Sequence, residues 1–549
     1  MKELQFAVIV IIGIILLLIA LDLYSRQKLR RTVRYRWGRQ PHQTRLDKEE
    51  SLKKAWQIEK SFLQSDSEVD DLTWYDLDMF AIFDLINATN SSVGSEALYQ
   101  RLRNFDLGQA DKTEDLIRYY QENPQIRENI QYLFARLGKQ DNNFTKDYLA
   151  NGVKKELGNF WLFVLLGCLP IIGILLLIFG QLIGIGVLLG AMVINVIYYM
   201  MKKNELETEL NSMRYLVQTI ALAEKIAKQP IPDQGAIKEN LKPLKGIASW
   251  GFSFRPKGAS EMELIMDYLN MMFMIPFIAY NFVLKKLAHH SQHAINLWEL
   301  LGNQEVAIAV LNFRTYMPLS CIPEFREGAV TAESVYHPLV NGAIVNPVDW
   351  QKNTLITGSN ASGKSTYVKA IAISCILSQT INTAVAESFT LQAGHVITSM
   401  AVEDNIFEGD SYFIAETKSI KRLLDLVATD VRCYCFIDEI LKGTNTVERI
   451  AASSSVVAWI AEHPSLAFVA THDIELTEIL KNKCANRHFE ETVTDEDGVT
   501  FSYKVKDGPA VSRNAIALLK VLKYPQAIVT NAQNEAAYFD KERSWQVLN

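Results

Sequence analysis

One stretch of the sequence has the residue types and spacing of a phosphate-binding loop: Gly358, Ser359, Asn360, Ala361, Ser362, Gly363, Lys364, Ser365 and Thr366. Glycines let backbone N–H groups wrap phosphate oxygens at the N-terminus of a helix. Lys364 would then reach the β- and γ-phosphates, and the Ser365 hydroxyl would bind Mg²⁺. Such a loop needs a strand before it and a helix after it, and residues 354–357 and 366–377 have these patterns. The sequence therefore predicts a site for ATP and Mg²⁺.

A second apolar strand is predicted at 433–437, and the acidic pair Asp438 and Glu439 follows it directly. In folds built on parallel strands, ligands bind in the crevice outside the carboxyl ends of the strands. We therefore expect Asp438 to hold the Mg²⁺ shell and Glu439 to orient or deprotonate the attacking water. An acidic pair after an apolar run is common on protein surfaces, so this assignment depends on its pairing with the phosphate-binding loop.

A third apolar strand, 466–470, is followed by Thr471, His472 and Asp473. A neutral imidazole both donates and accepts hydrogen bonds, so His472 could contact the γ-phosphate or the catalytic water. The alternative is a purely structural histidine. The place of His472 at the end of a third strand favours the catalytic role, which it would share with Glu439 and Lys364. The run 409–416 carries no chemistry that a single sequence can assign.

These residues need a scaffold, and the sequence predicts an α/β P-loop domain at 323–549. Residues 25–157 and 204–322 are dominated by apolar residues at helical spacing, which predicts an all-α core or lever domain in two segments. Within the first of them, Asn90 to Ser92 followed by Glu96 is typical of a helix start.

The first 24 residues predict a transmembrane anchor, because residues 6–21 are apolar and uncharged and a span needs about 20 such residues. A cleaved signal peptide is the alternative. The residues Met1 to Glu3 are not net positive, however, and no small-residue cleavage site follows the apolar stretch. The next segment carries the basic residues Arg26, Lys28, Arg30, Arg31, Arg34, Arg36 and Arg39.

That basic cluster predicts a cytoplasmic position and contact with anionic membrane lipid, with the N-terminus outside. A nucleic-acid-binding arm is the alternative interpretation of the same residues. A second apolar block, within 158–203, is too long for one span and contains a break at Gly180-Gln181. Two further spans are therefore predicted as a hairpin. Lysines flank both of its ends and place them in the cytoplasm together with the ATPase domain.

Composition excludes some functions. The formal net charge of -6 describes no overall polycation, so nucleic acid could bind only to a local patch. The six cysteines lack metal-ligand or disulfide spacing and are expected to be reduced, mostly buried thiols. The predicted spans contain almost no ionisable residue, which gives no sign of an ion pathway.

Together these stretches resemble the MutS family of ATPases, which are relatives of the ABC ATPases. The resemblance rests on four regions: the phosphate loop at 357–366, the Walker B strand and following loop at 437–446, the histidine switch at 470–473, and the domain entry at 336–347. It extends to the helical segments at 77–102 and 298–325. The implied fold is a MutS-type ATPase domain on a helical core.

The resemblance implies a homodimer in which each nucleotide lies between two subunits. Ser411 would be the signature serine offered to the partner's nucleotide, and Thr444 and Asn445 would lie in the loop that crosses to the partner. Departures from the family are equally clear. We expect no N-terminal mismatch-reading domain, because the first predicted span occupies its place, and no connector domain. The aromatic that members often place against adenine is replaced here by Ala343.

The sequence thus predicts a multi-pass cell-membrane protein that binds and hydrolyses ATP at composite dimer sites. DNA binding is the family's default expectation. Without the base-reading wedge it would rest on phosphate contacts, which give only salt-sensitive, non-specific affinity. The alternative is an ATPase module of a membrane transport or signalling assembly that binds no DNA.

Overall fold

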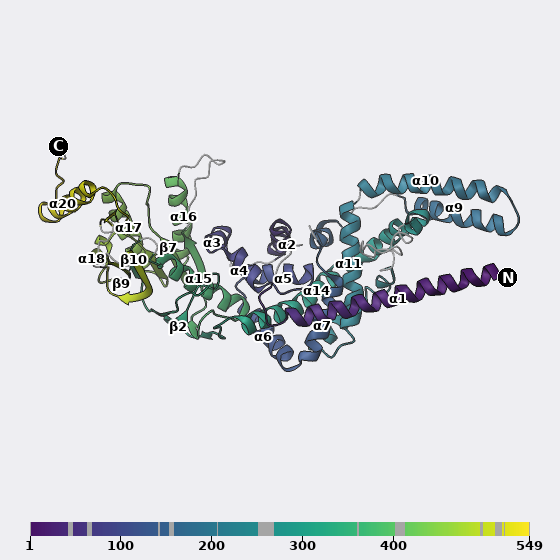
Figure 1. The fold of residues 1–549 in the computed structure, drawn as a ribbon, viewed down its shortest axis with the longest axis horizontal. Helices are drawn as coiled ribbons and strands as arrows, with labels where there is room; N and C mark the ends of the chain where they lie inside the picture. The colour runs from purple at the N-terminus through teal and green to yellow at the C-terminus, as the bar shows by residue number, and fades with distance from the viewer. Residues whose placement is uncertain are drawn as a thin grey trace. The chain divides into compact units, whose positions relative to one another are not determined.

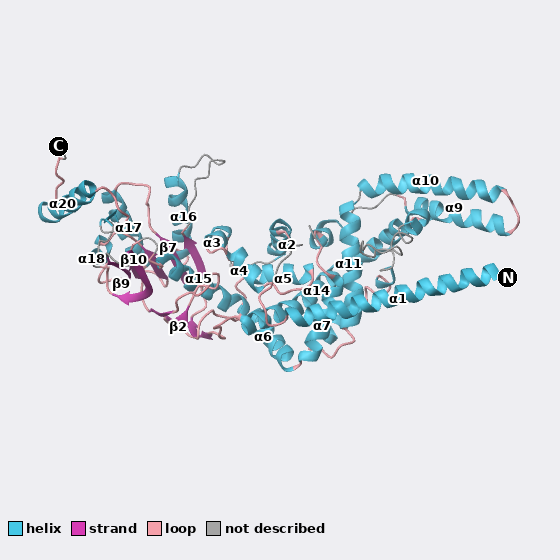
Figure 2. Cartoon of the chain, viewed as in Figure 1, coloured by secondary structure: helices cyan, strands magenta, loops and turns pink. Residues whose placement is uncertain are grey.

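The computed structural model describes residues 2–547 except 42–47, 63–67, 141–142, 153–158, 206, 251–267, 360–361, 401–411, 495–497, 511–515, 517–518 and 521. The chain forms two compact units (Figures 1 and 2). The helical unit comprises Met1–Ser65, Asp84–Arg101 and Lys112–Tyr316, and the α/β unit comprises Asp66–Phe83, Leu102–Asp111 and Met317–Asn549. Two N-terminal segments predicted within the helical part therefore belong to the α/β unit.

The helical unit is built from helices of very different length. Their bounds are α1 (Lys2–Arg36), α2 (Glu49–Phe62), α4 (Met79–Ile86), α5 (Ser92–Arg103), α6 (Leu107–Glu122), α7 (Pro124–Leu137), α8 (Thr145–Asp147), a π-helical turn (Tyr148–Gly152), α9 (Phe160–Ile178), α10 (Ile183–Glu205), α11 (Glu207–Ile226), α12 (Gln234–Leu241) and α14 (Ile275–Tyr316). Of these, α4, α5 and α6 lie partly in the α/β unit. The longest, α14, has a non-helical residue at His290 (φ -136°, ψ 25°).

The predicted helix start is confirmed, since α5 begins at Ser92. Its N-terminus is held by Glu305 of α14, whose carboxylate accepts hydrogen bonds from the backbone N–H of Asn90 at 2.6 Å and from the Ser91 hydroxyl. Burial raises the pKa of Glu305 to about 7. Gly94 is required here, because a Cβ at that position would lie 2.5 Å from a Glu305 carboxylate oxygen. A buried carboxyl group thus joins α5 to α14.

Helices α9 and α10 lie side by side as a hairpin (Figure 1). The predicted break is confirmed at Gly180, which has φ 76°. Two glycines allow close packing of the two helices: a Cβ at Gly173 would lie 2.9 Å from the Leu188 nitrogen, and one at Gly184 would lie 2.7 Å from the Gly173 oxygen. Among the described residues, α9 and α10 are the two helices long and apolar enough to cross a membrane.

The first predicted span falls in α1 and is not one of these two helices. The search covered only described residues, and most side chains before Leu16 lie outside them. The structure therefore offers two candidate spans where the sequence predicts three.

One polar side chain is buried inside the hairpin. Pro170 lies within α9 and has no N–H, so the carbonyl of Leu166 lacks its usual helical donor. The Asn195 side chain of α10 donates to that carbonyl at 2.8 Å and to the carbonyl of Met272 at 2.7 Å. The hairpin is thereby joined to the segment that leads into α14. The ring of Phe277 in α14 stacks on Phe163 of α9 with centroids 5.2 Å apart.

The α/β unit contains a six-stranded sheet of order β10-β9-β4-β8-β7-β6, parallel except for the β9–β10 pair. Its strands are β4 (Thr354–Thr357), β6 (His395–Ser399), β7 (Cys433–Asp438), β8 (Leu466–Ala470), β9 (Ala485–Thr494) and β10 (Gly498–Asp507). A four-stranded sheet of order β1-β5-β2-β3 is formed by β1 (Glu324–Phe325), β2 (Val330–Val335), β3 (Asn346–Trp350) and β5 (Ser388–Leu391). The helices are α3 (Asp71–Asp76), α15 (Lys364–Ile381), α16 (Tyr412–Val427), α17 (Thr446–Ile460), α18 (Glu475–Ile479) and α20 (Gln526–Glu542).

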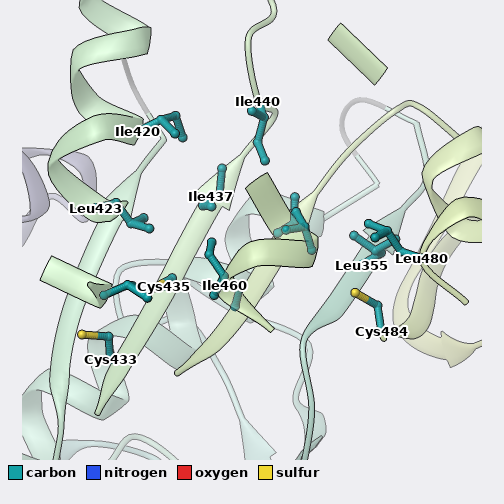
Figure 3. Close-up of a cluster of buried hydrophobic side chains, with 14 of the residues drawn as sticks. Leu355, Ile420, Leu423, Cys433, Cys435, Ile437, Ile440, Ile460, Leu480 and Cys484 are labelled. Carbon is teal, nitrogen blue, oxygen red and sulfur yellow. The ribbon is translucent and has the colours of Figure 1, made fainter. Parts of the chain in front are cut away.

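Alternate residues of β7 face two different cores, because successive side chains of a strand point to opposite faces. Tyr434 and Phe436 pack against the ring of Trp350, with centroids 5.5 and 5.2 Å apart. Cys433, Cys435 and Ile437 enter a cluster with apolar residues of α16, α17 and α18 (Figure 3). The expectation of reduced, mostly buried thiols holds for Cys375, Cys433, Cys435 and Cys484, whereas Cys168 is exposed and Cys321 is partly exposed.

Helix α3 covers the edge of the large sheet at β6. The backbone N–H of Thr398 donates to the Thr73 hydroxyl at 3.2 Å, and that of Met400 donates to the Asp76 carboxylate at 2.9 Å. The Thr398 hydroxyl donates to the same carboxylate at 2.6 Å. Side chains of α3 thus satisfy N–H groups that an edge strand would otherwise expose. This contact explains why a segment from early in the chain belongs to the α/β unit.

Candidate nucleotide site

The phosphate-binding loop connects β4 to α15, as predicted. Gly358 (φ 144°) and Gly363 (φ 101°) both adopt backbone conformations that side chains disfavour. A Cβ at Gly358 would also lie 2.7 Å from the carbonyl oxygen of Phe489. The Ser362 hydroxyl donates to the Ser359 carbonyl at 2.8 Å, which tightens the turn. Asn360 and Ala361 lie outside the described residues.

Lys364 lies folded over this loop. Its ammonium group donates to the carbonyl oxygens of Gly358 and Ser359, each at 2.7 Å. Burial lowers the pKa of Lys364, while the nearby carboxylates of Asp438 and Glu439 oppose that shift. A bound phosphate could replace these carbonyl oxygens as the acceptor of the ammonium group.

Ser365 and Asp438 lie at the ends of neighbouring elements of the site. The Ser365 hydroxyl donates to the Asp438 carboxylate at 2.7 Å. A hydroxyl and a carboxylate oxygen are the hard ligands that Mg²⁺ prefers, and Mg²⁺ usually takes few protein ligands beside phosphate oxygens and water. The described residues hold no cluster of three or more His, Cys, Asp or Glu suited to a metal. The pair therefore fits a magnesium ion that is shared with a phosphate.

Glu439 has a left-handed backbone (φ 60°) and two partners for its carboxylate. The imidazole Nε2 of His472 lies 3.1 Å from one oxygen, and the ammonium group of Lys442 lies 2.8 Å from the other. The pKa of His472 is lowered, first by burial and then by the charge of Lys364, which favours the neutral imidazole. Glu439 and His472 thus form a proton-accepting and hydrogen-bonding pair.

The parallel sheet brings these groups together. Asp438 pairs in register with Ala470 of β8, and the backbone N–H of Thr471 donates to the Ile356 carbonyl of β4 at 2.9 Å. The carboxyl ends of β4, β7 and β8 therefore lie side by side, each carrying one predicted group. Asp473 accepts two hydrogen bonds from Arg449, at 2.8 and 2.6 Å, which fixes the turn after His472.

For the other predicted site residues, the structure gives fewer contacts. Asn445 caps α17 by accepting from the Glu448 backbone N–H at 3.0 Å, and the Thr444 hydroxyl contacts the Glu448 carboxylate at 3.2 Å. Thr366 lines a cavity beside the loop. Ser411 lies outside the described residues. The role of Ser411, Thr444 and Asn445 toward a second subunit remains a prediction.

A cavity of about 440 Å³ opens beside the phosphate-binding loop. Its walls include Ala343, which replaces the expected aromatic, and the rings of Tyr503, Phe489 and Tyr367. Asn346 aims Tyr503 at this cavity: its amide donates to the Tyr503 carbonyl at 2.9 Å and accepts from the Val505 N–H at 2.9 Å. These bonds hold a register shift in β10, where a bulge re-aims side chains.

Three residues near the loop were not predicted from the sequence. The position of Tyr503 beside the cavity depends on the β10 bulge, and no pattern in the local sequence predicts that bulge. Glu491 of β9 accepts a hydrogen bond from the Ser359 hydroxyl at 2.5 Å. The ion pair of Lys442 with Glu439 could have been predicted, since the two residues have opposite charges and are three positions apart.

Comparison with known proteins identifies the C-terminal region. Residues 354–540 match the family described as MutS domain V. The DNA mismatch repair protein MutS of Natronomonas pharaonis is 28% identical over 248 residues, covering 42% of this chain and 29% of that protein. MutS of Lactococcus lactis subsp. cremoris is 31% identical over 182 residues, covering 32% and 21%. The human MutS protein homolog 4 is 29% identical over 277 residues, covering 47% and 29%.

The aligned part of this chain spans less than a third of the length of each of these relatives. The match nevertheless includes the phosphate-binding loop, the acidic pair after β7 and the histidine after β8. Residues 354–540 therefore belong to the family described as MutS domain V, and over this ATPase-type region the chain is similar to MutS proteins.

Proposed function

We propose that the chain is a Mg²⁺-dependent ATPase that acts as a dimer while attached to a membrane. The observation that carries the enzymatic part is the meeting of Lys364, the Ser365–Asp438 pair and the Glu439–His472 pair at the ends of three adjacent strands. Phosphate binding, metal binding and activation of water are thereby available within one site.

Each group has a definite task in hydrolysis. Lys364 would exchange its two loop carbonyls for phosphate oxygens, and the Ser365 hydroxyl and the Asp438 carboxylate would hold Mg²⁺. Bound Mg²⁺ supplies charge neutralisation at the phosphate oxygens. Glu439 accepts the proton of the attacking water, and neutral His472 orients that water or the γ-phosphate. We assign the nucleobase to the cavity walled by Tyr503, whose ring offers a stacking surface that Ala343 cannot.

A composite site can be tested by mixing two inactive variants. Lys364→Ala would disable the loop, and Ser411→Ala would disable the group offered to the partner. In a mixed dimer, one site carries both changes and the other carries neither. Equal amounts of the two variants should therefore recover about a quarter of wild-type activity, since about half of the dimers are mixed and each has one intact site. No recovery after subunit exchange would contradict the composite site.

Membrane attachment is proposed from the surface of the α9–α10 hairpin. Its outward-facing side chains are large and apolar, and they include Trp161, Leu165, Ile178, Phe179, Leu182, Ile183, Val193 and Ile197, each more than half exposed. An exposed apolar surface of this kind needs a bilayer or a partner to cover it. We assign it to the bilayer, because Lys202 and Lys203 follow the apolar stretch of α10 and suit the cytoplasmic interface.

This topology predicts a labelling pattern. A cysteine introduced as Gln181→Cys, at the turn between α9 and α10, should react in intact cells with a maleimide that cannot cross membranes. The matched variant Asp425→Cys, on the exposed face of α16, should react only after the cells are lysed. Labelling of each variant is compared with that of the unmodified chain. Reaction of the Gln181→Cys variant only after lysis would contradict an external turn.

The function that ATP drives has two candidates. DNA binding is suggested by the names of the relatives, which are mismatch repair proteins. An ATPase module of a membrane transport or signalling assembly is suggested by the hairpin and by the bond of Asn195 to Met272, in the segment that leads into α14. The effect of DNA on the rate of ATP hydrolysis separates these two candidates.

A further inference from the structure

Glu416 of α16 is a buried carboxylate with no role in the chemistry described above. Only 3% of its surface is exposed. Its side chain accepts a hydrogen bond from the backbone N–H of Lys442 at 2.9 Å, and the N–H of Gly443 lies 3.5 Å from its second oxygen. A charged acceptor aimed at two successive backbone amides makes a stronger restraint than a neutral one.

The backbone that Glu416 restrains is the turn directly after the catalytic carboxylates. Glu439 (φ 60°) and Leu441 (φ 56°) are both left-handed, a conformation that persists in non-glycine residues only where the surroundings enforce it. Three contacts enforce it here. The Glu439 N–H donates to the Ala470 carbonyl at 2.8 Å, the Ser453 hydroxyl donates to the Ile440 carbonyl at 3.2 Å, and Glu416 holds the far end of the turn.

Glu416 can act as a fixed point because α16 is itself held firmly. Ile420, Leu423 and Val427 of this helix are buried in the core against β7, and Figure 3 shows the first two. One turn after Glu416, the Ser419 hydroxyl donates to the Ser399 hydroxyl at 2.9 Å, which joins the helix to β6. The carboxylate of Glu416 therefore reaches the turn from a rigid element.

The position of the turn decides where two charged side chains lie. Lys442 donates its backbone N–H to Glu416 and places its ammonium group 2.8 Å from the Glu439 carboxylate. A turn that is free to relax would move both Lys442 and Glu439 relative to His472. A displacement of about 1 Å can lower a catalytic rate by about a hundredfold, because water must be held in line for attack.

We propose that Glu416 is a positioning residue for ATP hydrolysis, which sets the geometry of Glu439 and Lys442 through the backbone of residues 441–443. This inference rests on the ATPase function proposed above. Glu416 touches neither nucleotide nor water in this account, so it should influence the hydrolysis step and leave nucleotide binding unchanged.

The test uses the purified full chain with Glu416→Ala and Glu416→Gln. The alanine variant should lower kcat by roughly 10- to 100-fold, while KM and the Kd for a fluorescent ATP analogue stay within about threefold of wild type. The glutamine variant keeps one acceptor oxygen and should lose less. Asp425→Asn, on an exposed part of the same helix, is the matched control and should retain wild-type kcat.

A double variant separates positioning from a general loss of structure. If Glu416 acts through Glu439, then Glu416→Ala should cause little further loss of single-turnover hydrolysis in a Glu439→Gln background. Wild-type kcat in the Glu416→Ala variant, or a loss that adds in full to that of Glu439→Gln, would overturn the proposal. Absence of hydrolysis by the wild-type chain would instead overturn the ATPase function on which the proposal rests.

Discussion

Replacing Glu439 with glutamine should lower the turnover of ATP by at least about a hundredfold, the usual scale for removal of a general base. The amide matches the carboxylate in shape but cannot take a proton from water. Lys364, Ser365 and Asp438 do not depend on the Glu439 charge to contact phosphate and Mg²⁺, so nucleotide should remain bound. Single-turnover hydrolysis and the Kd for a fluorescent ATP analogue measure the two effects separately.

The control for this variant is Glu462→Gln. Glu462 is an exposed residue outside the site, and its carboxylate lies 2.9 Å from the Lys483 ammonium group. It should behave as wild type, because exposed ion pairs contribute little. Unchanged turnover in Glu439→Gln would show that another group accepts the proton. In that case the contacts of Glu439 with His472 and Lys442 would stabilise the turn and would have no part in catalysis.

The strands that carry the site could be predicted closely from the sequence. The structure has β4 at Thr354–Thr357 and β8 at Leu466–Ala470, which are the predicted ranges, and β7 at Cys433–Asp438 adds one residue. All three strands are buried on both faces, so each is a short, mainly apolar run, and predicted site residues lie within two positions of its end. Parallel pairing then places these site residues at one edge of the sheet.

Features that depend on distant contacts could not be predicted. The hydrogen bond between Thr398 and Asp76 joins residues 322 positions apart, and nothing in the sequence near Asp76 indicates that its helix covers β6. The direction of Tyr503 depends on the amide of Asn346, 157 positions away. Residues of these types are common on surfaces, so only the fold gives them their roles.

The α9–α10 hairpin could be predicted only in part, because its internal structure follows from the local sequence and its attachment depends on distant contacts. Its two helices and the break at Gly180 follow from a long apolar run interrupted by a residue that permits positive φ. Its attachment to α14 was not predicted. That attachment depends on the Asn195 amide donating to the Met272 carbonyl and on Phe277 of α14 stacking on Phe163, both far apart in the sequence.

The second large effect is expected for Lys364→Ala. This ammonium group is the cation that the loop holds by two carbonyls at 2.7 Å, and alanine offers nothing to the β- and γ-phosphates. Hydrolysis should fall to background. The loop glycines and the Ser365–Asp438 pair stay unchanged, so the variant should keep the fold and the thermal stability of wild type.

The most direct measurement is therefore the rate of Mg²⁺-dependent phosphate release by the purified, detergent-solubilised wild type and by Lys364→Ala, each with and without DNA. We expect hydrolysis by the wild type that stops when Mg²⁺ is chelated, and background release by the variant. A change with DNA would favour the DNA-linked candidate, and no change would favour a membrane assembly. Equal Mg²⁺-dependent rates for the two proteins, or no release by the wild type, would contradict an ATPase site built on Lys364.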